Sequence, residues 1–289
     1  MGQAVKVAFL GPAGTFSEEA VRTSGFTGED FEAVPCASIP DAIEAVASGA
    51  AERAMLPFEN SIEGSVRPTM DSLLEQSDRV TVLGEFRMPI REALIALDGT
   101  EIGQITEVIS HPQPLAQCDR FIREELPHAS VRVVSSTSAA VKEVSEGSPG
   151  MAAIAPASAA AIYDCSVLRE AIEDEPGNET RFLWIGPQSS QPDEEAGSGS
   201  GWKTTLVFSE LGADHPGALV DALVEFSDRG INMVRIESRP QKRELGRYQF
   251  FIDVEGRESD PEVASALDGL RSKAGEVRVL GSYPAMPAG

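Results

Sequence analysis

Short apolar runs recur along residues 1–186, each followed by a polar turn and then by a segment with helical periodicity. Residues 5–10 (VKVAFL) are such a run before a Gly-rich turn, and residues 131–134 (VRVV) precede a run of hydroxyl side chains. This alternation is typical of a mostly parallel α/β sheet. Such sheets bind ligands at the carboxyl ends of their strands, so the polar turns are the first candidates for a site.

The turn at residues 11–17 (GPAGTFS) joins the first predicted strand to a helix. It places backbone N–H groups and hydroxyls, including that of Thr15, at a helix N-terminus, which favours anions. Phe16 occupies the position where a dinucleotide fingerprint needs Gly, and no Gly-Lys-Ser/Thr follows, so neither a Rossmann loop nor a P-loop is predicted. An ordinary tight turn is the alternative interpretation.

A second polar turn follows the predicted strand at residues 54–58. Glu59, Asn60 and Ser61 come directly after this strand, and Gly64 lies just before the next helix. A carboxylate, an amide and hydroxyls are therefore crowded between a strand end and a helix start. The alternative is an Asx-rich turn that only caps the helix.

Further polar candidates follow later strands. Ser110 and His111 end the strand predicted over 105–109, and Gln117 lies in the helix predicted over 115–126. Thr137 belongs to four hydroxyl residues at the start of a helix, which suit either an N-cap or an anion site. A single His after a strand is more often structural than catalytic.

Residues 177–186 (GNETRFLWIG) begin as a turn and end as an apolar strand. Thr180 and Arg181 lie at the mouth of this strand, where a hydroxyl can share a proton and a guanidinium can bind a carboxylate through two parallel hydrogen bonds. The alternative is a surface loop with a solvated Arg.

Residues 187–201 (PQSSQPDEEAGSGSG) are polar, lack apolar periodicity and are predicted to be a linker. After them the predicted elements follow the order βαββαβ, a ferredoxin-like unit that more often binds and associates than catalyses. We predict a catalytic domain at 1–186, with lobe 1 at about 1–80 and 177–186 and lobe 2 at about 81–176. The linker then leads to a regulatory domain at 202–284.

Composition limits the partners. The net charge of −22 argues against nucleic acid and anionic membranes. No apolar run approaches the roughly 20 residues of a membrane span, and the start lacks the pattern of a signal peptide. Cys36, Cys118 and Cys165 form no CxxC pair, and the three histidines show no ligand spacing. We therefore expect a cytoplasmic protein without a disulfide framework, metal or cofactor.

Taken together, the motifs resemble the prephenate dehydratase family along nearly the whole chain, and in the family's order. They are GPAGTFS (11–17), PFENS with GSV (57–61 and 64–66), SHPQPLAQC (110–118) and NETRF (178–182). The tail resembles an ACT regulatory domain through PGAL (216–219), GIN (230–232) and ESRP (237–240). Phe58 is a departure, since the family often has Ile there, and the residues before Pro216 also differ from the usual pattern.

The resemblance implies a two-lobed catalytic domain like a type II periplasmic binding protein, with its active site in the cleft. It implies conversion of prephenate to phenylpyruvate with loss of carbon dioxide and water, without a cofactor. It also implies feedback control by L-phenylalanine at the ACT domain and a homodimer or homotetramer.

The site residues follow from matching the motifs, except Thr137, which is added because it lies at a helix start. Those expected to be catalytic are Thr180, Asn60, Ser61, Gln117 and Ser110. Those expected to bind the substrate are Arg181, Phe182, Thr15, Thr137, His111 and Gly64. Those expected to bind L-phenylalanine, at an interface between two ACT domains, are Gly217, Ala218, Leu219, Asn232, Glu237 and Ser238. Glu59 would repel a dianion, so it is expected to brace Arg181 or a backbone amide instead.

Two alternatives stay open on the sequence alone. One is arogenate as the substrate, in which an amine replaces the keto group of prephenate. The other is a non-catalytic sensor of amino acids or keto acids, which would need Arg181 but not Thr180 or the hydroxyl clusters.

Overall fold

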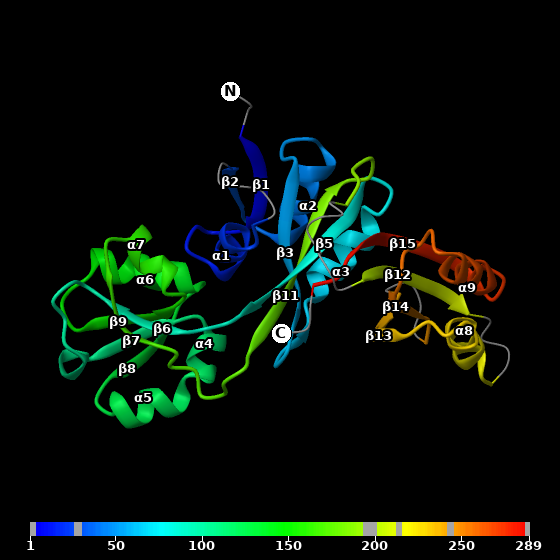
Figure 1. The fold of residues 1–289 in the computed structure, drawn as a ribbon. Helices are drawn as coiled ribbons and strands as arrows, with labels where there is room; N and C mark the ends of the chain where they lie inside the picture. Colours follow the sequence, from blue (N-terminus) through cyan, green and yellow to red (C-terminus); the bar gives the residue numbers. More distant parts are fainter. Residues whose placement is uncertain (1–3, 26–30, 193–200, 212–215, 242–245, 287–289) are drawn as a thin grey trace. The chain divides into compact units, whose positions relative to one another are not determined.

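A computed structural model of the chain describes residues 4–25, 31–192, 201–211, 216–241 and 246–286. Helices and strands alternate along its first part, and a smaller βαββαβ module follows (Figure 1). The predicted α/β class is confirmed. Part of the predicted linker, residues 193–200, lies outside the described residues, and the predicted lobe and domain boundaries stay a prediction.

The first sheet has the strand order β2-β1-β3-β11-β5, with the short β4 paired to β3. Its strands are β1 Val5–Leu10, β2 Phe31–Cys36, β3 Arg53–Asn60, β4 Gly64–Ser65, β5 Val80–Pro89 and β11 Glu179–Pro187. The helices between them in the chain are α1 Phe16–Thr23, α2 Ile39–Ala47 and α3 Arg67–Glu75. β1 and β2 are parallel, and the apolar centre of β1 is completely buried, as its unbroken hydrophobic run predicts.

The second sheet has the order β10-β6-β9-β7-β8. β7 is parallel to β8 and β9, whereas β6 is antiparallel to β9 and β10. The strands are β6 Ala93–Ala96, β7 Glu107–Ser110, β8 Ser130–Val133, β9 Met151–Ala155 and β10 Ser166–Glu170. The helices are η1 Ile102–Gln104, α4 Pro112–Gln117, α5 Asp119–Glu125, α6 Thr137–Glu146 and α7 Ser158–Ile162.

Helices cover both faces of this second sheet (Figure 1). Leu94, Val108 and Ile154 pack with apolar residues of α4 and α5, whereas their strand neighbours Ile95 and Ile109 pack with α6 and α7. Alternate residues of each strand therefore enter opposite cores, which explains why these strands are apolar throughout.

The C-terminal module is a four-stranded antiparallel sheet of order β13-β14-β12-β15. Its elements are β12 Trp202–Leu211, α8 Ala218–Ser227, β13 Met233–Pro240, β14 Tyr248–Glu255, α9 Pro261–Arg271 and β15 Ala274–Pro284. The two helices share a buried core with the sheet, including Phe208, Phe226 and Leu267. The predicted βαββαβ order is confirmed.

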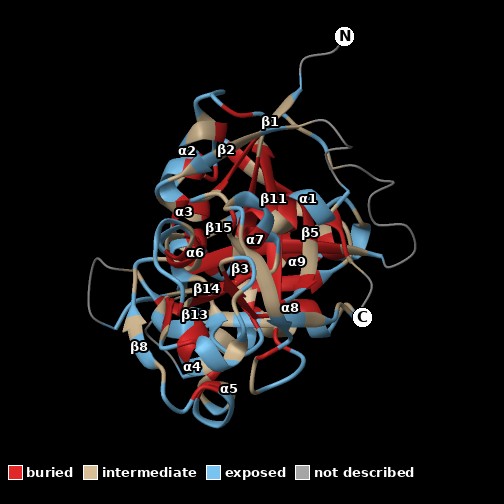
Figure 2. Ribbon diagram, turned by 90° about the vertical axis from the view of Figure 1, so that its left-hand side faces the viewer, coloured by how far each residue is buried: buried red, intermediate tan, exposed pale blue. Residues whose placement is uncertain are grey.

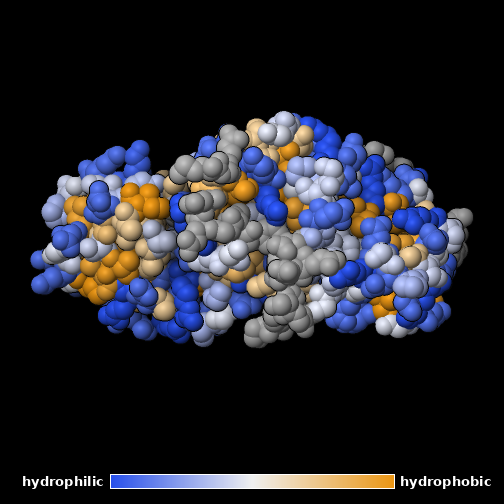
Figure 3. Space-filling view, turned by 45° about the horizontal axis from the view of Figure 1, so that its top comes forward, coloured by the Kyte–Doolittle hydropathy of each residue, from blue (hydrophilic) through white to orange (hydrophobic). Residues whose placement is uncertain are grey.

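The chain forms two compact units. The first comprises Met1–Ala42, Met55–Gly64 and Arg87–Phe182, and the second comprises Ile43–Ala54, Ser65–Phe86 and Leu183–Gly289. Every residue predicted for catalysis or substrate binding lies in the first unit, and every residue predicted for effector binding lies in the second. Figure 2 shows buried residues concentrated in the strands. Hydrophilic side chains cover much of the face in Figure 3, which fits the acidic composition.

Three element predictions were wrong in detail. β5 runs without a break through Gly84 to Pro89, where the sequence predicts one strand over 80–83 and another over 87–97. The helix predicted over 115–126 is divided at Cys118, whose backbone leaves the helical region with φ −116° and ψ 21°. β10 was missed because it is an edge strand whose polar sequence (SVLRE) shows no apolar alternation.

Candidate active site

The end of β3 and the start of β11 are joined by the side chain of Asn60. Its Nδ2 donates to Thr180 Oγ1 (2.9 Å) and to Asn178 Oδ1 (2.7 Å). Its Oδ1 accepts from the backbone N–H groups of Ile62 (3.0 Å) and Glu63 (2.9 Å), so the same side chain also closes the Asx turn that the sequence suggested. Asn60 is therefore both a turn former and a link between two distant motifs.

The hydroxyl of Thr180 is oriented by this network. Asn60 and Thr180 are 8% and 7% exposed. Because Thr180 Oγ1 accepts from the amide of Asn60, its own proton is directed to another acceptor. The arrangement thus makes Thr180 a positioned hydrogen-bond donor.

Ser61 reinforces the junction from the neighbouring position. Its N–H donates to Glu179 O (2.9 Å), and its Oγ accepts from the N–H of Glu179 (3.0 Å). Its hydroxyl also lies 3.4 Å from Asn178 Oδ1. Asn178 was quoted in a sequence motif but not nominated, although a turn Asn beside Thr180 was the signal that could have identified it.

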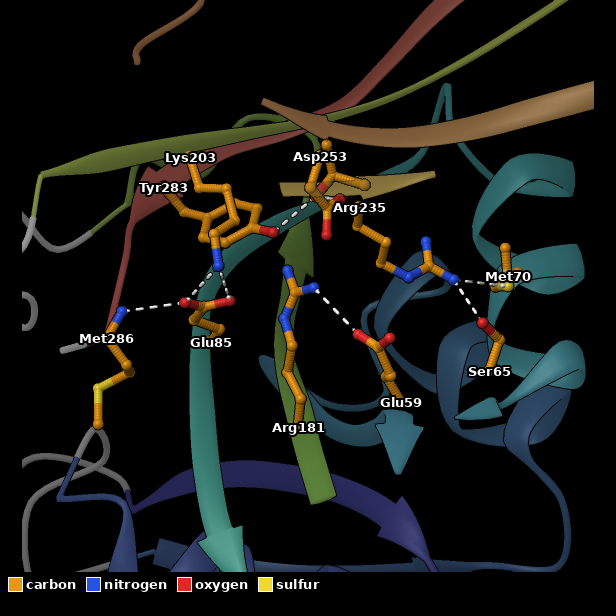
Figure 4. Close-up of polar contacts among 11 residues, drawn as sticks. Glu59, Ser65, Met70, Glu85, Arg181, Lys203, Arg235, Asp253, Tyr283 and Met286 are labelled. Carbon is orange, nitrogen blue, oxygen red and sulfur yellow. Dashed lines mark hydrogen bonds and ion pairs between the residues drawn. The ribbon is translucent and has the colours of Figure 1, made fainter. Parts of the chain in front are cut away.

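Arg181 makes a different set of contacts from Thr180. Its Nη1 lies 3.7 Å from Glu59 Oε2 (Figure 4). Its guanidinium carbon lies 5.2 Å from the ring centre of Phe58. The separation from Glu59 exceeds hydrogen-bond length, so the contact is an ion pair. This is the bracing expected of Glu59. Successive residues of a strand point to opposite faces, which fits these separate surroundings.

The turn before α1 packs against the helices of the second sheet. Tyr163 donates to Ala13 O (3.2 Å), and Gly14, with φ +79°, has Ser138 Oγ 3.4 Å from the position its missing Cβ would take. Burial, and then the Glu18 carboxylate, raise the pKa of Tyr163. Residues 11–14 are therefore held beside the start of α6, where Thr137 lies.

Thr15 and its helix end are less open to an anion than predicted. Thr15 Oγ1 donates to Leu10 O (3.1 Å) and makes no hydrogen bond to the helix that it precedes. The N–H of Gly14 donates to Glu18 Oε2 (2.7 Å), so a carboxylate of the protein already uses part of this turn.

The polar residues around α4 fall into two groups. Ser110 is completely buried and donates to Ile154 O (2.6 Å), while His111 Nδ1 caps α4 by accepting from the N–H of Gln113 (3.4 Å). Both therefore have clear structural roles. Gln117 differs, since its Nε2 is buried and makes no hydrogen bond within the described part of the chain.

The remaining predicted residues are placed as follows. Phe182 is 1% exposed and belongs to the core. Gly64 adopts φ +79° in β4 with open space around it. Thr137 is the first residue of α6, which Ser136 caps by accepting from the N–H of Ala139 (3.0 Å).

In the second unit, Gly217 adopts φ +100° and begins α8. Asn232 is exposed, and its carbonyl accepts from the N–H of Glu255 (2.9 Å). Glu237 and Ser238 lie on β13, next to Arg239, which donates to Asp71 Oδ2 on α3 (3.1 Å). A pocket of about 360 Å³ is lined by Asp71, Leu74, Glu75, Pro240, Gln241, Gln249, Glu276 and Arg278.

A second Arg of β13 makes a similar contact. Arg235 Nη2 donates to Ser65 Oγ at 2.6 Å and lies 3.6 Å from the sulfur of Met70 (Figure 4). Strand β13 is therefore tied to β4 and α3 by two guanidinium groups within the second unit.

Comparison with known proteins gives matches to both parts of the chain. Residues 7–190 match the family model for prephenate dehydratase, and residues 206–272 match that for the ACT domain. Prephenate dehydratase of Amycolatopsis methanolica is 37% identical over 278 residues, which cover 96% of this chain and 88% of that protein.

Two solved structures have the same fold along nearly the whole chain. Prephenate dehydratase from Arthrobacter aurescens in complex with L-Phe has a TM-score of 0.86 and 37% identity, over 98% of this chain and 93% of that one. GqqA, described as a novel type of quorum quenching acylase, also has a TM-score of 0.86, with 32% identity over 98% of both chains. No helix in the described residues has the length and apolar character to cross a membrane.

Proposed function

The chain belongs to the prephenate dehydratase family and carries an ACT domain, and from this premise we propose that Thr180, held by Asn60, is the centre of its catalytic site. The observation that carries this assignment is the hydrogen bond from Asn60 Nδ2 to Thr180 Oγ1. It joins two family motifs and leaves a buried hydroxyl with a proton to donate.

The reaction needs little from the protein beyond positioning and proton supply. Prephenate is a dicarboxylate with a hydroxyl at C4 of a cyclohexadiene ring. When the C4–O bond and the bond between C1 and its carboxylate break, the ring becomes aromatic. One proton is taken up, and phenylpyruvate, carbon dioxide and water form. Aromatisation supplies the driving force, so the site must hold the dianion and help the hydroxyl to leave.

The hydroxyl of Thr180 could assist the reaction at either of the two bonds that break. It can donate to the departing hydroxyl at C4 or to the ring carboxylate at C1. Asn60 and Ser61 hold Thr180 and the start of β11 in place. Gln117, whose buried Nε2 makes no hydrogen bond within the described residues, supplies a further donor, and Ser110 fixes the strand end beside it.

Substrate binding is assigned to residues around these elements. Arg181 would hold a carboxylate of prephenate, and its approach to Glu59 fixes the direction of the guanidinium. Thr15, Thr137, His111 and Gly64 would shape the surroundings from three turns and a helix start, and Phe182 would support β11 from the core.

The C-terminal module would bind L-phenylalanine and inhibit the enzyme. Support comes from the ACT match and from a family member whose structure contains L-Phe. Gly217, Ala218 and Leu219 at the start of α8 would receive the carboxylate of the amino acid. Asn232, Glu237 and Ser238 lie on or just before β13 and would complete this site.

Association into a homodimer or homotetramer is part of the same proposal. β13 is an edge strand, and Val234 and Ile236 on it are 44% and 47% exposed. Val220 on α8 is 60% exposed. Apolar side chains on a sheet edge are typical of surfaces that pair with a second copy.

We also place the enzyme in the cytoplasm, since its three cysteines are unpaired.

The contacts of β13 suggest how the effector signal reaches the catalytic residues. Arg239 binds Asp71 on α3, and Arg235 binds Ser65 in β4. In the chain, β4 and α3 directly follow the loop that carries Asn60 and Ser61. A shift of β13 on binding L-phenylalanine would therefore pull on the segment that leads out of this loop.

The experiment is an assay of phenylpyruvate formation from prephenate by the purified protein, with and without millimolar L-phenylalanine. Rapid turnover that L-phenylalanine suppresses is the expected result. Turnover that L-phenylalanine does not change would contradict the assignment of L-phenylalanine as the effector. Binding without turnover would favour a sensor, and cleavage of an acyl amide in place of prephenate would favour an acylase.

A further inference from the structure

Glu92 is a buried carboxyl group that the assignments above do not use. It lies between β5 and β6 and is 1% exposed. Its Oε2 makes no hydrogen bond within the described part of the chain. Burying a carboxylate without a partner is expensive, so this position needs an explanation.

The strand register places Glu92 at the end of the second sheet where β7 and β9 have their carboxyl ends and where the catalytic candidate Ser110 lies. The next residue, Ala93, pairs with Ala155, the last residue of β9. Ser110, the last residue of β7, donates to Ile154 O at this same edge. The carboxyl ends of two parallel strands and Glu92 therefore share one edge, which is where α/β sheets bind ligands.

Backbone contacts connect Glu92 to the other site elements. Two residues earlier, the N–H of Ile90 donates to Asn178 O (2.8 Å), and Asn178 holds Asn60. The carbonyl of Glu92 accepts from the N–H of Ile172 (3.1 Å), and two residues later the N–H of Asp174 donates to Gln117 O (2.7 Å). Glu92 thus lies in the short segment between β5 and β6, and backbone hydrogen bonds lead from this segment to the Thr180 junction and, through residues 172–174, to Gln117.

The groups around Glu92 keep it protonated. Burial first, and then the carboxylates of Glu173 and Glu19, raise the pKa of Glu92 from 4.5 to about 8. Glu173 Oε2 accepts from the N–H of Glu92 (3.0 Å), and Glu173 Oε1 pairs with the exposed Arg91 (3.4 Å). Burial first, and then Glu92, Asp174 and Glu173, raise the pKa of the Cys118 thiol. Cys118 therefore stays protonated and does not act as a base.

The first unit contains further buried polar atoms that lack a partner among the described residues. Gln117 Nε2 and Ser138 Oγ make no hydrogen bonds among the described residues. Gln117 precedes Cys118, which lies near enough to Glu92 for the two groups to influence each other's ionisation, and Ser138 lies against the turn before α1. Together they offer an acid, an amide donor and a hydroxyl that a polar ligand can satisfy.

We propose that Glu92 is the acid that protonates the hydroxyl leaving C4 of prephenate. The O–H bond of Glu92 breaks as its proton bonds to the hydroxyl oxygen, which takes the electron pair of the C4–O bond and leaves as water. The electron pair of the bond between C1 and its carboxylate enters the ring, and carbon dioxide leaves. The Glu92 carboxylate then regains a proton from water. Thr180 is left to bind the ring carboxylate.

The test is the pH dependence of turnover in Glu92→Gln, with Glu107→Gln as the matched control. Glu107 lies at the opposite end of the same sheet in an ion pair with Arg132 (2.9 Å). Glu92→Gln keeps the shape of the side chain but cannot transfer a proton. We expect kcat to fall about 10²–10⁴-fold with little change in KM. The loss of kcat above about pH 8 should appear in wild type and Glu107→Gln and be absent from the residual activity of Glu92→Gln.

Wild-type kcat in Glu92→Gln, or a change confined to KM, would overturn the assignment. If this variant does not fold, measurements on the wild-type protein test the proposal instead. Its infrared spectrum at pH 7 should contain the band of a protonated carboxylic acid, which disappears together with kcat as the pH rises through 8. A constant kcat up to pH 9, or no such band, would contradict the proposal. A wild-type protein inactive on prephenate would instead contradict the family activity in this chain.

Discussion

Asn60 Nδ2 donates a hydrogen bond of 2.9 Å to Thr180 Oγ1, and so joins two residues 120 positions apart in the chain. The bond fixes which partner donates, because the oxygen of the same amide already accepts from two backbone N–H groups. The Thr180 proton is consequently directed away from Asn60. This contact brings together two sequence motifs that are far apart in the chain.

Stability should depend on pH through Glu92. Its pKa of about 8 in the folded protein lies above the ordinary value of 4.5. The folded protein holds a proton that the unfolded chain releases, so the free energy of unfolding should fall as pH rises between these values. The loss should be on the order of a few kcal/mol over that window.

Urea unfolding of wild type, Glu92→Gln and Glu107→Gln at pH 5 and pH 8 measures this effect. The difference between the two pH values should shrink in Glu92→Gln alone, since the amide does not titrate. An equal difference in all three proteins would show that Glu92 is ionised at neutral pH.

The buried ion pair of the second unit should be sensitive to loss of one partner. Lys203 Nζ lies 2.8 and 2.9 Å from the two carboxylate oxygens of Glu85, and the side chains are 8% and 0% exposed (Figure 4). Lys203→Met leaves a buried carboxylate without its cation and should cost about 3–5 kcal/mol. Thermal unfolding measures this loss.

An exposed pair and a double variant provide the controls. Arg79→Ala, which removes the surface pair of Arg79 with Glu44, should cost less than about 1 kcal/mol. Lys203→Met combined with Glu85→Leu should recover much of the stability, because neither charge of this pair is left buried without the other. Equal losses for Lys203→Met and Arg79→Ala would mean that the buried pair is solvated.

Much of the fold was predictable because the signals were local. The apolar runs predicted the strands, and Asn60 was recognised as an Asx-turn residue before its contacts were known. The order of the motifs identified the family. Such features depend on residues close together in the chain, where periodicity and turn chemistry are readable.

The contacts of the site were less predictable because they depend on tertiary packing. The sequence nominated Thr180 and Arg181 together, but the structure gives them separate partners, Asn60 and Glu59. Ser110 proved to bond to a strand distant in the chain and His111 to cap its own helix, so both have structural hydrogen bonds. Glu92 was missed, since nothing in a single sequence shows that a Glu between two strands becomes completely buried beside other carboxylates.

Feedback inhibition should depend on the contact between Arg239 and Asp71. Asp71→Asn removes the charge that Arg239 binds at 3.1 Å, yet lies outside the ACT domain. We expect L-phenylalanine to bind but to inhibit at least about fivefold less effectively, since allosteric coupling is typically worth 1–3 kcal/mol. Calorimetry measures the binding, and the assay of phenylpyruvate formation measures the inhibition.

The matched control for this variant is Asp268→Asn. Asp268 pairs with Arg271 on the exposed side of α9 (2.9 Å) and should not affect regulation. Normal inhibition of Asp71→Asn by L-phenylalanine would exclude α3 as the route of the signal.

The most direct measurement is kcat of Thr180→Ala beside Thr180→Ser, each with its melting temperature. Loss of one positioned donor typically costs about 10²–10³-fold in kcat, and Ser restores the hydroxyl to the position that Asn60 bonds. We predict that kcat of Thr180→Ala falls by this amount while the protein stays folded, and that Thr180→Ser retains most of the activity. If kcat of Thr180→Ala stays within about threefold of wild type, Thr180 has no part in the reaction.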